Sequence, residues 1–301
     1  MTTVKRTALL TGATGFVGSN LARRLLENGW QVHILSRAGS HLPDTSEFSL
    51  VINHVHDGST ESMVSCVKQA KPDIVFHLAS LFLSQHSSED IEKLIISNVL
   101  FGNQLLEAMK INNINNIINT GTSWQHYNNE KYNPVCLYAA TKQAFEAILE
   151  YYVHANNFKA ITLKLFDTYG LDDPRPKLFN LLNKAAISGK PLDMSIGEQL
   201  IDLVHIDDVT DAYLIAAERL LLSKVSRHEC YAVSSGHPLP LKDIVELYNN
   251  IIDSNIQVNW GARPYRYREV MIPWYSGEIL PCWNSNVDLI SGLKSLVKEA
   301  R

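Results

Sequence analysis

The sequence predicts an α/β protein with a doubly wound parallel sheet and a smaller α/β C-terminal lobe. First, the opening stretch runs through an apolar strand pattern, a glycine turn, an amphipathic helix ending near Gly29 and a second strand at residues 31–36. Second, short apolar runs alternate with helical patterns up to about residue 170, and third, the alternation loosens afterwards. We therefore expect one domain over residues 1–170 and a second lobe over 171–301, with the segment near 200–222 returning to the first domain.

The next elements along the chain complete the first domain. Apolar runs predict strands within residues 48–56, 72–80, 114–121 and 159–166. Between them, residues 98–109 and 137–152 repeat apolar side chains at helical spacing. Strands that alternate with helices in this way form a parallel sheet with helices on both faces.

Composition excludes several classes of protein. With 301 residues, 46% of them hydrophobic, the chain can bury a large core. The 27 Lys and Arg against 31 Asp and Glu give a net charge of -4, which argues against a nucleic-acid partner. The four cysteines lack a C-x-x-C spacing, and no apolar run approaches the ~18 residues of a membrane span. We expect a cytoplasmic protein with no metal site and no membrane partner.

The glycine turn "TGATGFVG" predicts a dinucleotide site of the Rossmann type. Gly12 permits the tight turn, Gly15 lets the backbone approach a pyrophosphate, and Gly18 allows the helix to pack closely on the strand. The helix N-terminus then faces the phosphates, so the backbone of Thr14, Phe16 and Val17 belongs to the same expected contact surface. The position in the first strand-to-helix turn is the context that this motif requires.

The second strand ends in Ser36 and Arg37, where an NAD site usually carries an acidic residue. A hydroxyl and a guanidinium there suit the 2′-phosphate of NADP(H), although Arg37 could also be an ordinary exposed side chain. We therefore expect NADP(H) as the preferred cofactor, with NAD(H) as the alternative.

Two later strand ends should also meet the cofactor. Asp57 could accept a hydrogen bond from the adenine amino group, or it could cap the following helix. Leu78, Ala79 and Ser80 follow the next strand, at the carboxyl edge of the sheet where ligands bind in such folds.

Tyr138 and Lys142 lie four residues apart in the helical stretch 137–152, so both polar tips share one helix face. Alone, this spacing is also typical of a surface pair without a function. His77 and His205 fall on expected strands and are better explained as core histidines than as metal ligands.

The order of "TGATGFVG", "PDIVFHLAS", "SNVLFGNQLLEA", "NTGTSW" and "LYAATK" resembles the extended short-chain dehydrogenase/reductases, the NAD-dependent epimerase/dehydratase family. Later segments, "LKLFDTYG" and "GEQLIDLVHIDDVTDAY", are similar to that family as well. The resemblance implies that the first domain binds the dinucleotide and that the C-terminal lobe binds a nucleotide-sugar substrate. It also implies a homodimer, formed through the helices near residues 99–110 and 138–152.

The resemblance assigns the catalytic residues. It implies that Tyr138 is the catalytic tyrosine, Lys142 its lysine, and Thr122 the hydroxyl that orients the substrate oxygen; Thr122 could otherwise be an ordinary strand-end residue. The lysine and a nicotinamide cation would lower the pKa of Tyr138 from its usual value near 10. Asn98 matches a family asparagine between sheet and cofactor, or else caps a helix.

Departures from the family pattern narrow the reaction. Ser123 and Trp124 stand where the 4,6-dehydratases have an Asp-Glu pair, which argues against dehydration. Ile201 replaces an arginine that grips the substrate diphosphate in many members, so we expect other cations to bind it. The expected substrate contacts are Thr122, Ser123, Asp167, Lys177, Arg263 and Arg266.

The segment "GARPYRYREVMIPWY" interleaves basic and aromatic residues, a pattern that suits a diphosphate beside a stacked base, or a basic surface loop. With "GEQLIDLVHIDD", it is similar to the branch of bacterial enzymes that includes CDP-abequose and CDP-paratose synthases. This resemblance implies an NADPH-dependent reductase of a nucleotide-activated 4-keto-6-deoxy or dideoxy sugar, used in surface polysaccharides such as O-antigen. The alternatives are a nucleotide-sugar epimerase with tightly bound NAD and a redox-sensing binding protein without catalysis.

Overall fold

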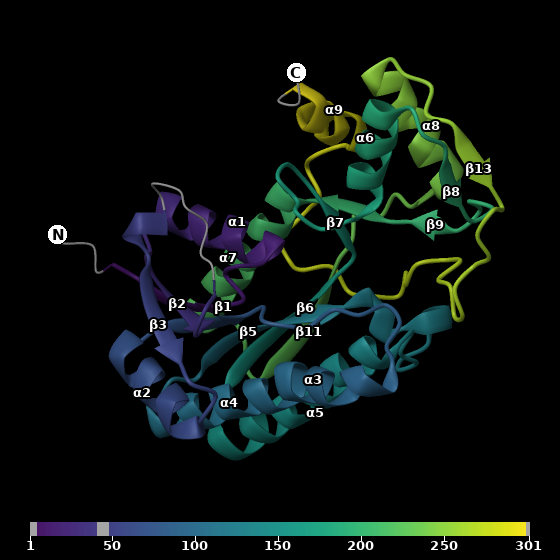
Figure 1. Cartoon of the computed structure of the whole chain (residues 1–301). Helices are drawn as coiled ribbons and strands as arrows, with labels where there is room; N and C mark the ends of the chain where they lie inside the picture. The colour runs from purple at the N-terminus through teal and green to yellow at the C-terminus, as the bar shows by residue number, and fades with distance from the viewer. Residues whose placement is uncertain (1–4, 41–47, 299–301) are drawn as a thin grey trace.

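The computed structural model describes residues 5–40 and 48–298, and the predicted α/β fold is confirmed. Its centre is a parallel sheet of seven strands in the order β11-β6-β5-β4-β1-β2-β3 (Figure 1). The strands are β1 (Thr7–Thr11), β2 (Gln31–Arg37), β3 (Ile52–His56), β4 (Ile74–His77), β5 (Asn116–Thr122), β6 (Lys159–Leu165) and β11 (His228–Val233). The order reverses between β1 and β4, which is where ligands bind in open α/β sheets.

Helices cover both faces of the sheet. Helices α1 (Phe16–Glu27) and α7 (Ile206–Leu221) lie on one face, and α2 (Thr60–Ala70), α4 (Phe101–Ile111) and α5 (Leu137–Asn156) lie on the other. Side chains alternate along a strand, so Leu10 of β1 packs in the core under α1 and α7, while Leu9 packs in the core under α2, α4 and α5. Both leucines are fully buried. Burial on both faces explains why the strands read as continuous apolar runs.

Between β4 and α4 the chain forms short helical turns. These are η2 (Ser88–Asp90), α3 (Ile91–Ile95) and the π-helical turn η3 (Ile96–Leu100), which leads into α4. Other single turns are η1 (Phe48–Leu50), η4 (Ser123–Gln125) and η5 (Tyr127–Asn129). Asn98 lies inside η3, so the alternative that it caps a helix is wrong.

The C-terminal lobe has its own small core above the carboxyl edge of the sheet (Figure 1). Its elements are α6 (Leu178–Ser188), β8 (Leu192–Met194), β9 (Leu200–Ile201), β12 (Leu239–Pro240), α8 (Leu241–Ile252), β13 (Val258–Trp260) and α9 (Leu289–Lys298). Strand β13 pairs with β8 and β12 pairs with β9, while β7 (Asp167–Tyr169) pairs with β10 (Leu203–His205).

The chain returns from the lobe to the sheet. Helix α7 packs on α1, and β11 then pairs with β6 at the edge of the sheet. The sequence analysis expected a return near residues 200–222 but did not identify β11. The first three residues of β11, from His228, are only half-buried, so the strand lacks the apolar run that marks the others.

A long irregular segment, residues 261–283, runs from β13 back to the sheet domain; we call it the strap. Asn129 fastens it, because its side-chain oxygen accepts hydrogen bonds from the backbone of Tyr275 and Ser276, each at 3.1 Å. Arg268 of the strap stacks on Tyr127 at 4.3 Å. The strap therefore joins lobe and sheet domain on one side of the molecule.

Candidate active site

The glycine turn between β1 and α1 has the geometry that the sequence predicts. Gly12 adopts φ +77°, and a Cβ there would lie 2.7 Å from the backbone nitrogen of Ala79. A Cβ on Gly18 would lie 2.1 Å from the carbonyl oxygen of Gly12, so α1 packs directly on the turn. A larger side chain at Gly12 would push the turn away from the loop after β4, and one at Gly18 would push the helix away from the turn.

The loops after β1 and β4 are held together at the switch point of the sheet. The Thr11 hydroxyl oxygen accepts hydrogen bonds from the backbone nitrogens of Leu78 at 3.2 Å and Ala79 at 3.1 Å. It also bonds His77 Nδ1 at 2.9 Å. Burial and the charge of Lys142 lower the pKa of His77 to about 3, so this histidine is a neutral core residue.

This cradle fits the pyrophosphate of a nicotinamide dinucleotide. Gly15 caps α1 without a side-chain bond, and a Cβ there would contact just the Gly12 oxygen, at 3.4 Å, among the described residues. The backbone nitrogens that begin α1 are thus open to an anion. Residues 12–17, Ala79 and Ser80 would hold the group, which would supply the hydride-transfer chemistry of a nicotinamide when bound.

Asn98 couples this cradle to α5. Its side-chain oxygen accepts from the backbone nitrogen of Leu81 at 2.7 Å and from the Ser80 hydroxyl at 3.2 Å. Its amide nitrogen donates to the Thr141 hydroxyl at 2.9 Å, and Thr141 donates to the carbonyl of Tyr138 at 2.7 Å. The asparagine is 2% exposed, so it fixes the loop after β4 to the first turn of α5.

The ends of β2 and β3 place the expected adenosine contacts. Ser36 is buried, and its hydroxyl donates to the Asn53 side chain at 2.8 Å. Arg37 is the exposed last residue of β2. Asp57 is exposed and accepts from the backbone of Ser59 at 2.8 Å, but Ser59, not Asp57, is the N-cap of α2.

The predicted catalytic residues come from the end of β5 and the start of α5. Thr122 ends β5, and its hydroxyl oxygen accepts a hydrogen bond from the backbone nitrogen of Trp124 at 3.3 Å. The hydroxyl proton therefore remains available for a substrate oxygen. Tyr138 and Lys142 lie one turn apart on α5, with Tyr138 half-buried and Lys142 buried.

Burial shifts the pKa values of both α5 residues. Desolvation raises the pKa of Tyr138, the nearby Cys136 adds to this, and a hydrogen bond with Ser80 opposes it. Desolvation lowers the pKa of Lys142 to about 8, and the charge of Glu146 opposes that shift. The predicted lowering of the tyrosine pKa by Lys142 is therefore not supplied by the side chains of the protein. Burial sets the direction of the shift instead, and the other charge in that prediction, the nicotinamide cation, belongs to the cofactor.

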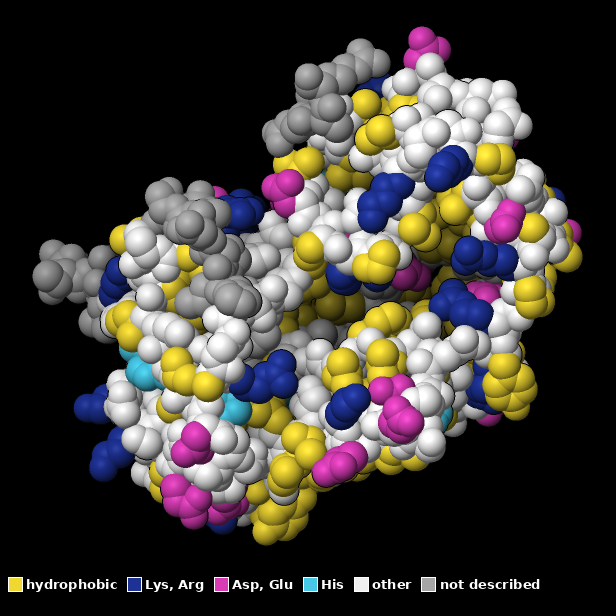
Figure 2. All heavy atoms as spheres, viewed as in Figure 1, with side chains coloured by type: hydrophobic (Ala, Val, Ile, Leu, Met, Phe, Trp, Pro, Cys, Tyr) yellow, Lys and Arg dark blue, Asp and Glu magenta, His cyan; other side chains and the backbone are white. Residues whose placement is uncertain are grey.

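A cavity of about 880 Å³ lies between the sheet domain, the lobe and the strap. Figure 2 shows it as a hollow with hydrophobic side chains inside and Lys and Arg side chains along its rim. Among its lining residues are these predicted substrate contacts: Ser123, Asp167, Lys177, Arg263 and Arg266. Thr122 and Tyr138 are not among the lining residues, but Phe82 is, and its ring meets Tyr138 edge-on with centroids 5.0 Å apart.

The charged lining residues differ in how far they are already paired. Lys177 forms an ion pair with Asp167 at 3.6 Å. Arg266 pairs with Glu269 at 3.2 Å and lies 5.8 Å from the ring of Trp124. Within the described part of the chain, the guanidinium of Arg263 makes no hydrogen bond or ion pair.

An aromatic wall lines the cavity, with contacts to both the tyrosine and the charged rim, and the sequence analysis did not predict it. We define the wall as Phe82, Trp124, Phe166 and Trp274, all of which line the cavity. Phe82 also contacts Trp124 at 5.6 Å, and Trp274 stacks parallel to Phe166 at 6.3 Å. These residues come from separate loops and the strap, so no periodic pattern links them in the sequence.

Arg175 was also missed. Its guanidinium pairs with Asp173 at 2.6 Å and stacks on Phe16 of α1 at 4.7 Å. Its charge acts on Tyr138 and favours a lower tyrosine pKa. The proximity of an arginine to both α1 and the tyrosine depends on how the loop after β7 folds back, which local sequence does not indicate.

The described residues, 5–40 and 48–298, contain neither a membrane-spanning helix nor a metal-binding cluster. No helix in these ranges combines the length and apolar character needed to cross a bilayer. Nor do these residues bring together three or more His, Cys, Asp or Glu side chains in an arrangement that could bind a metal ion.

Comparison with known proteins gives the family. The NAD dependent epimerase/dehydratase family matches residues 8–227. CDP-abequose synthase of Yersinia pseudotuberculosis is 28% identical over an alignment of 276 residues that covers 89% of this chain and 91% of that protein. A probable UDP-glucuronate 4-epimerase of Rhizobium meliloti is 24% identical, with 95% and 90% covered.

A solved structure has the same fold. UDP-glucose 4-epimerase of Thermotoga maritima, determined with UDP-glucose, superposes with a TM-score of 0.83 at 22% identity, and 98% of each chain is covered. The relatives named above carry the names of enzymes that modify nucleotide sugars. The family match spans most of the sheet domain and extends into the returning segment, so the chain belongs to the NAD-dependent epimerase/dehydratase family.

Proposed function

We propose that the protein catalyses the NADPH-dependent reduction of the 4-keto group of a CDP-linked 6-deoxy or 3,6-dideoxy sugar. Its product would serve the synthesis of surface polysaccharide such as O-antigen. In this proposal the sheet domain, residues 1–170 with the returning segment, holds the dinucleotide. The lobe, with the strap, holds the nucleotide part of the substrate.

The observation that carries the proposal is the aromatic wall, which contacts Tyr138 through Phe82 and Arg266 through Trp124. In this proposal, a sugar with its diphosphate near Arg263 and its carbonyl at Tyr138 would lie against Phe82, Trp124 and Phe166. Aromatic side chains offer few hydrogen bonds, so each sugar hydroxyl buried against them would lose its water partners. A ring that lacks the 6-hydroxyl, or the 3- and 6-hydroxyls, avoids this loss.

The catalytic residues supply the other half of the argument. Reduction of a ketone to an alcohol adds a hydride, which the reduced nicotinamide supplies when bound, and a proton, which Tyr138 donates to the carbonyl oxygen. Thr122 donates a hydrogen bond to the same oxygen and orients it. Because burial raises the pKa of Tyr138, the phenol stays protonated at neutral pH, as a proton donor must.

The choice of CDP follows the curated relatives. Besides the Yersinia protein, CDP-abequose synthase of Salmonella muenchen is 25% identical over 301 residues, with 99% of both chains covered. The choice of NADPH follows the strand ends, since Arg37 is exposed at the end of β2 with no acidic residue beside it.

The test measures nicotinamide absorbance while CDP-, dTDP-, GDP- and UDP-linked 4-keto sugars are offered to the purified protein. We expect one NADPH consumed for each CDP-linked keto sugar reduced. Tyr138→Phe should lower kcat by at least about 100-fold with little change in NADPH affinity. Tyr151→Phe, an exposed tyrosine on the same helix, is the matched control and should retain wild-type turnover.

The alternative is an epimerase, favoured by relatives named UDP-glucuronate and UDP-glucose 4-epimerase. An epimerase keeps its nicotinamide through both half-reactions, so the purified protein would contain tightly bound NAD. Substrate isomerised by such a preparation, with no net oxidation of NADPH, would replace the reductase proposal with this one.

A further inference from the structure

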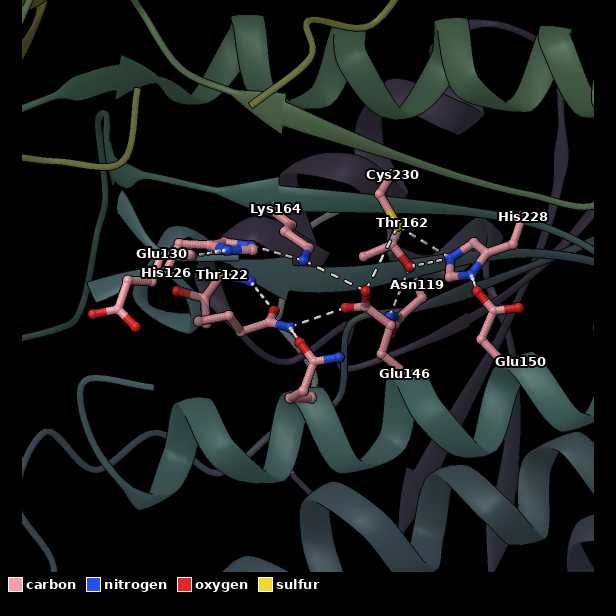
Figure 3. A network of polar contacts seen from close by, with 12 residues as sticks. Asn119, Thr122, His126, Glu130, Glu146, Glu150, Thr162, Lys164, His228 and Cys230 are labelled. Carbon is pink, nitrogen blue, oxygen red and sulfur yellow. Dashed lines mark hydrogen bonds and ion pairs between the residues drawn. The ribbon is translucent and has the colours of Figure 1, made fainter. Parts of the chain in front are cut away.

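A buried polar network extends behind the catalytic residues, between α5 and strands β5, β6 and β11 (Figure 3). At its centre lies Glu146, one helical turn after Lys142 on α5. One carboxylate oxygen, Oε2, accepts from Gln125 Nε2 at 2.9 Å. The other, Oε1, pairs with Lys164 Nζ at 3.4 Å and accepts from the Cys230 thiol at 3.6 Å.

The contacts of Glu146 all suit an acceptor. Each group that contacts it is a donor, and an ionised carboxylate is purely an acceptor. Lys164 is 5% exposed and Glu146 8% exposed, so their ion pair is largely shielded from water. A buried pair of this kind makes the loss of one partner costly, because the other charge is left without compensation.

Gln125 transmits this arrangement to Thr122. The glutamine is fully buried, and its Oε1 accepts the backbone N–H of Thr122 at 3.0 Å. Its Nε2 donates to Glu146 and, at 2.7 Å, to Gln143. Glu146 thereby determines which way the Gln125 amide points, and the amide in turn holds the end of β5 where the Thr122 hydroxyl is presented.

Glu146 also acts on Lys142. Its negative charge raises the pKa of Lys142 against the lowering caused by burial, which leaves that pKa at about 8. His77, at the end of β4, is the other titratable group whose charge interacts with Lys142, and its own pKa of about 3 keeps it neutral. The charge of Glu146 therefore helps to keep Lys142 protonated at neutral pH.

A third branch of the polar network, through Lys164 and His126, reaches Trp274 of the aromatic wall. Lys164 Nζ lies 2.8 Å from His126 Nε2, and His126 Nδ1 lies 3.0 Å from the carbonyl oxygen of Glu130. His126 must then carry its proton on Nδ1 and accept from Lys164. Its ring stacks on Trp274 of the strap, with centroids 4.0 Å apart.

We propose that Glu146 is a positioning residue for the proposed reduction. Through one network, Glu146 connects the charge of Lys142, the orientation of Thr122 and the Trp274 side of the substrate cavity. The proposal rests on the proposed function for the meaning of these three groups. Its physical content, the link from Glu146 to Lys142 and Thr122, is measurable without any substrate.

The test compares Glu146→Gln with Glu150→Gln. Glu150 lies one turn further along α5 and bonds His228 at 2.7 Å, so its change removes the same charge from the same helix. Lysine labelled with ¹³C is titrated by NMR, with the Lys142 signal identified by its absence in Lys142→Arg. Glu146→Gln should move the Lys142 titration to lower pH by about 1 unit, the low end for loss of a nearby opposite charge. Glu150→Gln should leave it in place.

Turnover gives the second readout. The alkaline limb of the kcat profile should move to lower pH with the Lys142 titration in Glu146→Gln, and kcat at pH 7 should fall by roughly 10-fold, since Thr122 loses its support. A Lys142 titration that stays in place, or that moves equally in Glu150→Gln, overturns the proposal.

A third variant covers the case in which Glu146→Gln does not fold. Glu146→Asp keeps the charge but is too short to reach Gln125, so it should hold the Lys142 titration and still lower kcat. A shifted titration, or an unchanged kcat, contradicts the proposal. If the wild-type protein reduces none of the keto sugars, the proposed function fails, while the NMR titration still decides the role of Glu146.

Discussion

Arg37 is the residue on which the choice between the two nicotinamide cofactors rests. Ser36, the other expected contact, already donates its hydroxyl to Asn53, so the guanidinium is the group left to bind a 2′-phosphate. Arg37→Ala should weaken NADPH binding by roughly 10- to 100-fold, the range for a lost charged hydrogen bond. Calorimetric titration with NADPH and NADH gives the measurement. NADH serves as the control, and equal weakening of both cofactors would contradict the assignment.

Arg263 is the best candidate for the diphosphate contact that Ile201 cannot make. It lines the cavity without an ion pair among the described residues, whereas Arg266 is held by Glu269 and Lys177 by Asp167. Arg263→Ala should therefore raise the KM for the sugar nucleotide by roughly 10- to 100-fold, with NADPH affinity unchanged. The matched control is Arg266→Ala, with a smaller expected effect. If Arg266→Ala raised the KM more than Arg263→Ala, the diphosphate contact would be assigned to Arg266.

At the scale of single residues, the sequence predicts the roles that depend on local spacing. Tyr138 and Lys142 are one turn apart in any helix, and the glycine turn is a local motif, so both could be placed from the sequence. The sign of the Tyr138 pKa shift could not, because it depends on burial that tertiary packing creates. Trp274 reaches the cavity through the irregular strap, for which no periodicity exists.

Among the elements, α7 shows how a returning segment is fixed in place. Asp208, in its first turn, is 2% exposed and accepts hydrogen bonds from Ser285, Asn286 and Val287, each at 3.0 Å. Trp283 donates its indole N–H to the Asp208 carbonyl at 2.8 Å. The segment that follows the strap is thereby attached to a helix of the sheet domain.

Asp208→Asn should lower the free energy of unfolding by about 2 kcal/mol. The carboxylate accepts three N–H or O–H donors, and the amide would turn an N–H toward one of them, which leaves a buried donor unpaired. Urea unfolding followed by circular dichroism measures the change. The neighbouring Asp207, with 70% of its side chain exposed, provides the control, and Asp207→Asn should change stability by less than about 0.5 kcal/mol. Equal effects in the two variants would refute this view of α7.

The elements could be predicted where hydrophobic periodicity is strong. The strands β1, β2, β4, β5 and β6 are buried on both faces and read as apolar runs. The edge strand β11 begins with His228 and Glu229, half-exposed, so its pattern is broken. The alternative that Asn98 caps a helix was wrong, since an asparagine inside a helical stretch has the same local signature as a cap.

At the scale of the whole molecule, one exposed apolar surface bears on how copies of the chain assemble. One side of the protein carries an apolar surface on α3, η3 and α5, away from the cavity. It includes Ile91, Ile95 and Leu100, each 43–46% exposed, and Tyr151, 62% exposed. Ala144 and Ala147 of α5 are also exposed. An exposed apolar patch of this kind is more typical of an interface than of a solvated face.

We therefore predict a homodimer in which the same helices of two copies pack together as a four-helix bundle. Light scattering coupled to size-exclusion chromatography should give twice the 33.8 kDa of the chain at micromolar concentration. Ala147→Arg places a long charged side chain on this surface and should yield monomers, because two such cations would meet across the two-fold axis. Ile187→Arg, on α6 of the lobe and 79% exposed, is the control and should leave the dimer intact. Wild-type protein that remains a monomer, or an Ala147→Arg variant that still dimerises, would place the interface elsewhere or remove it.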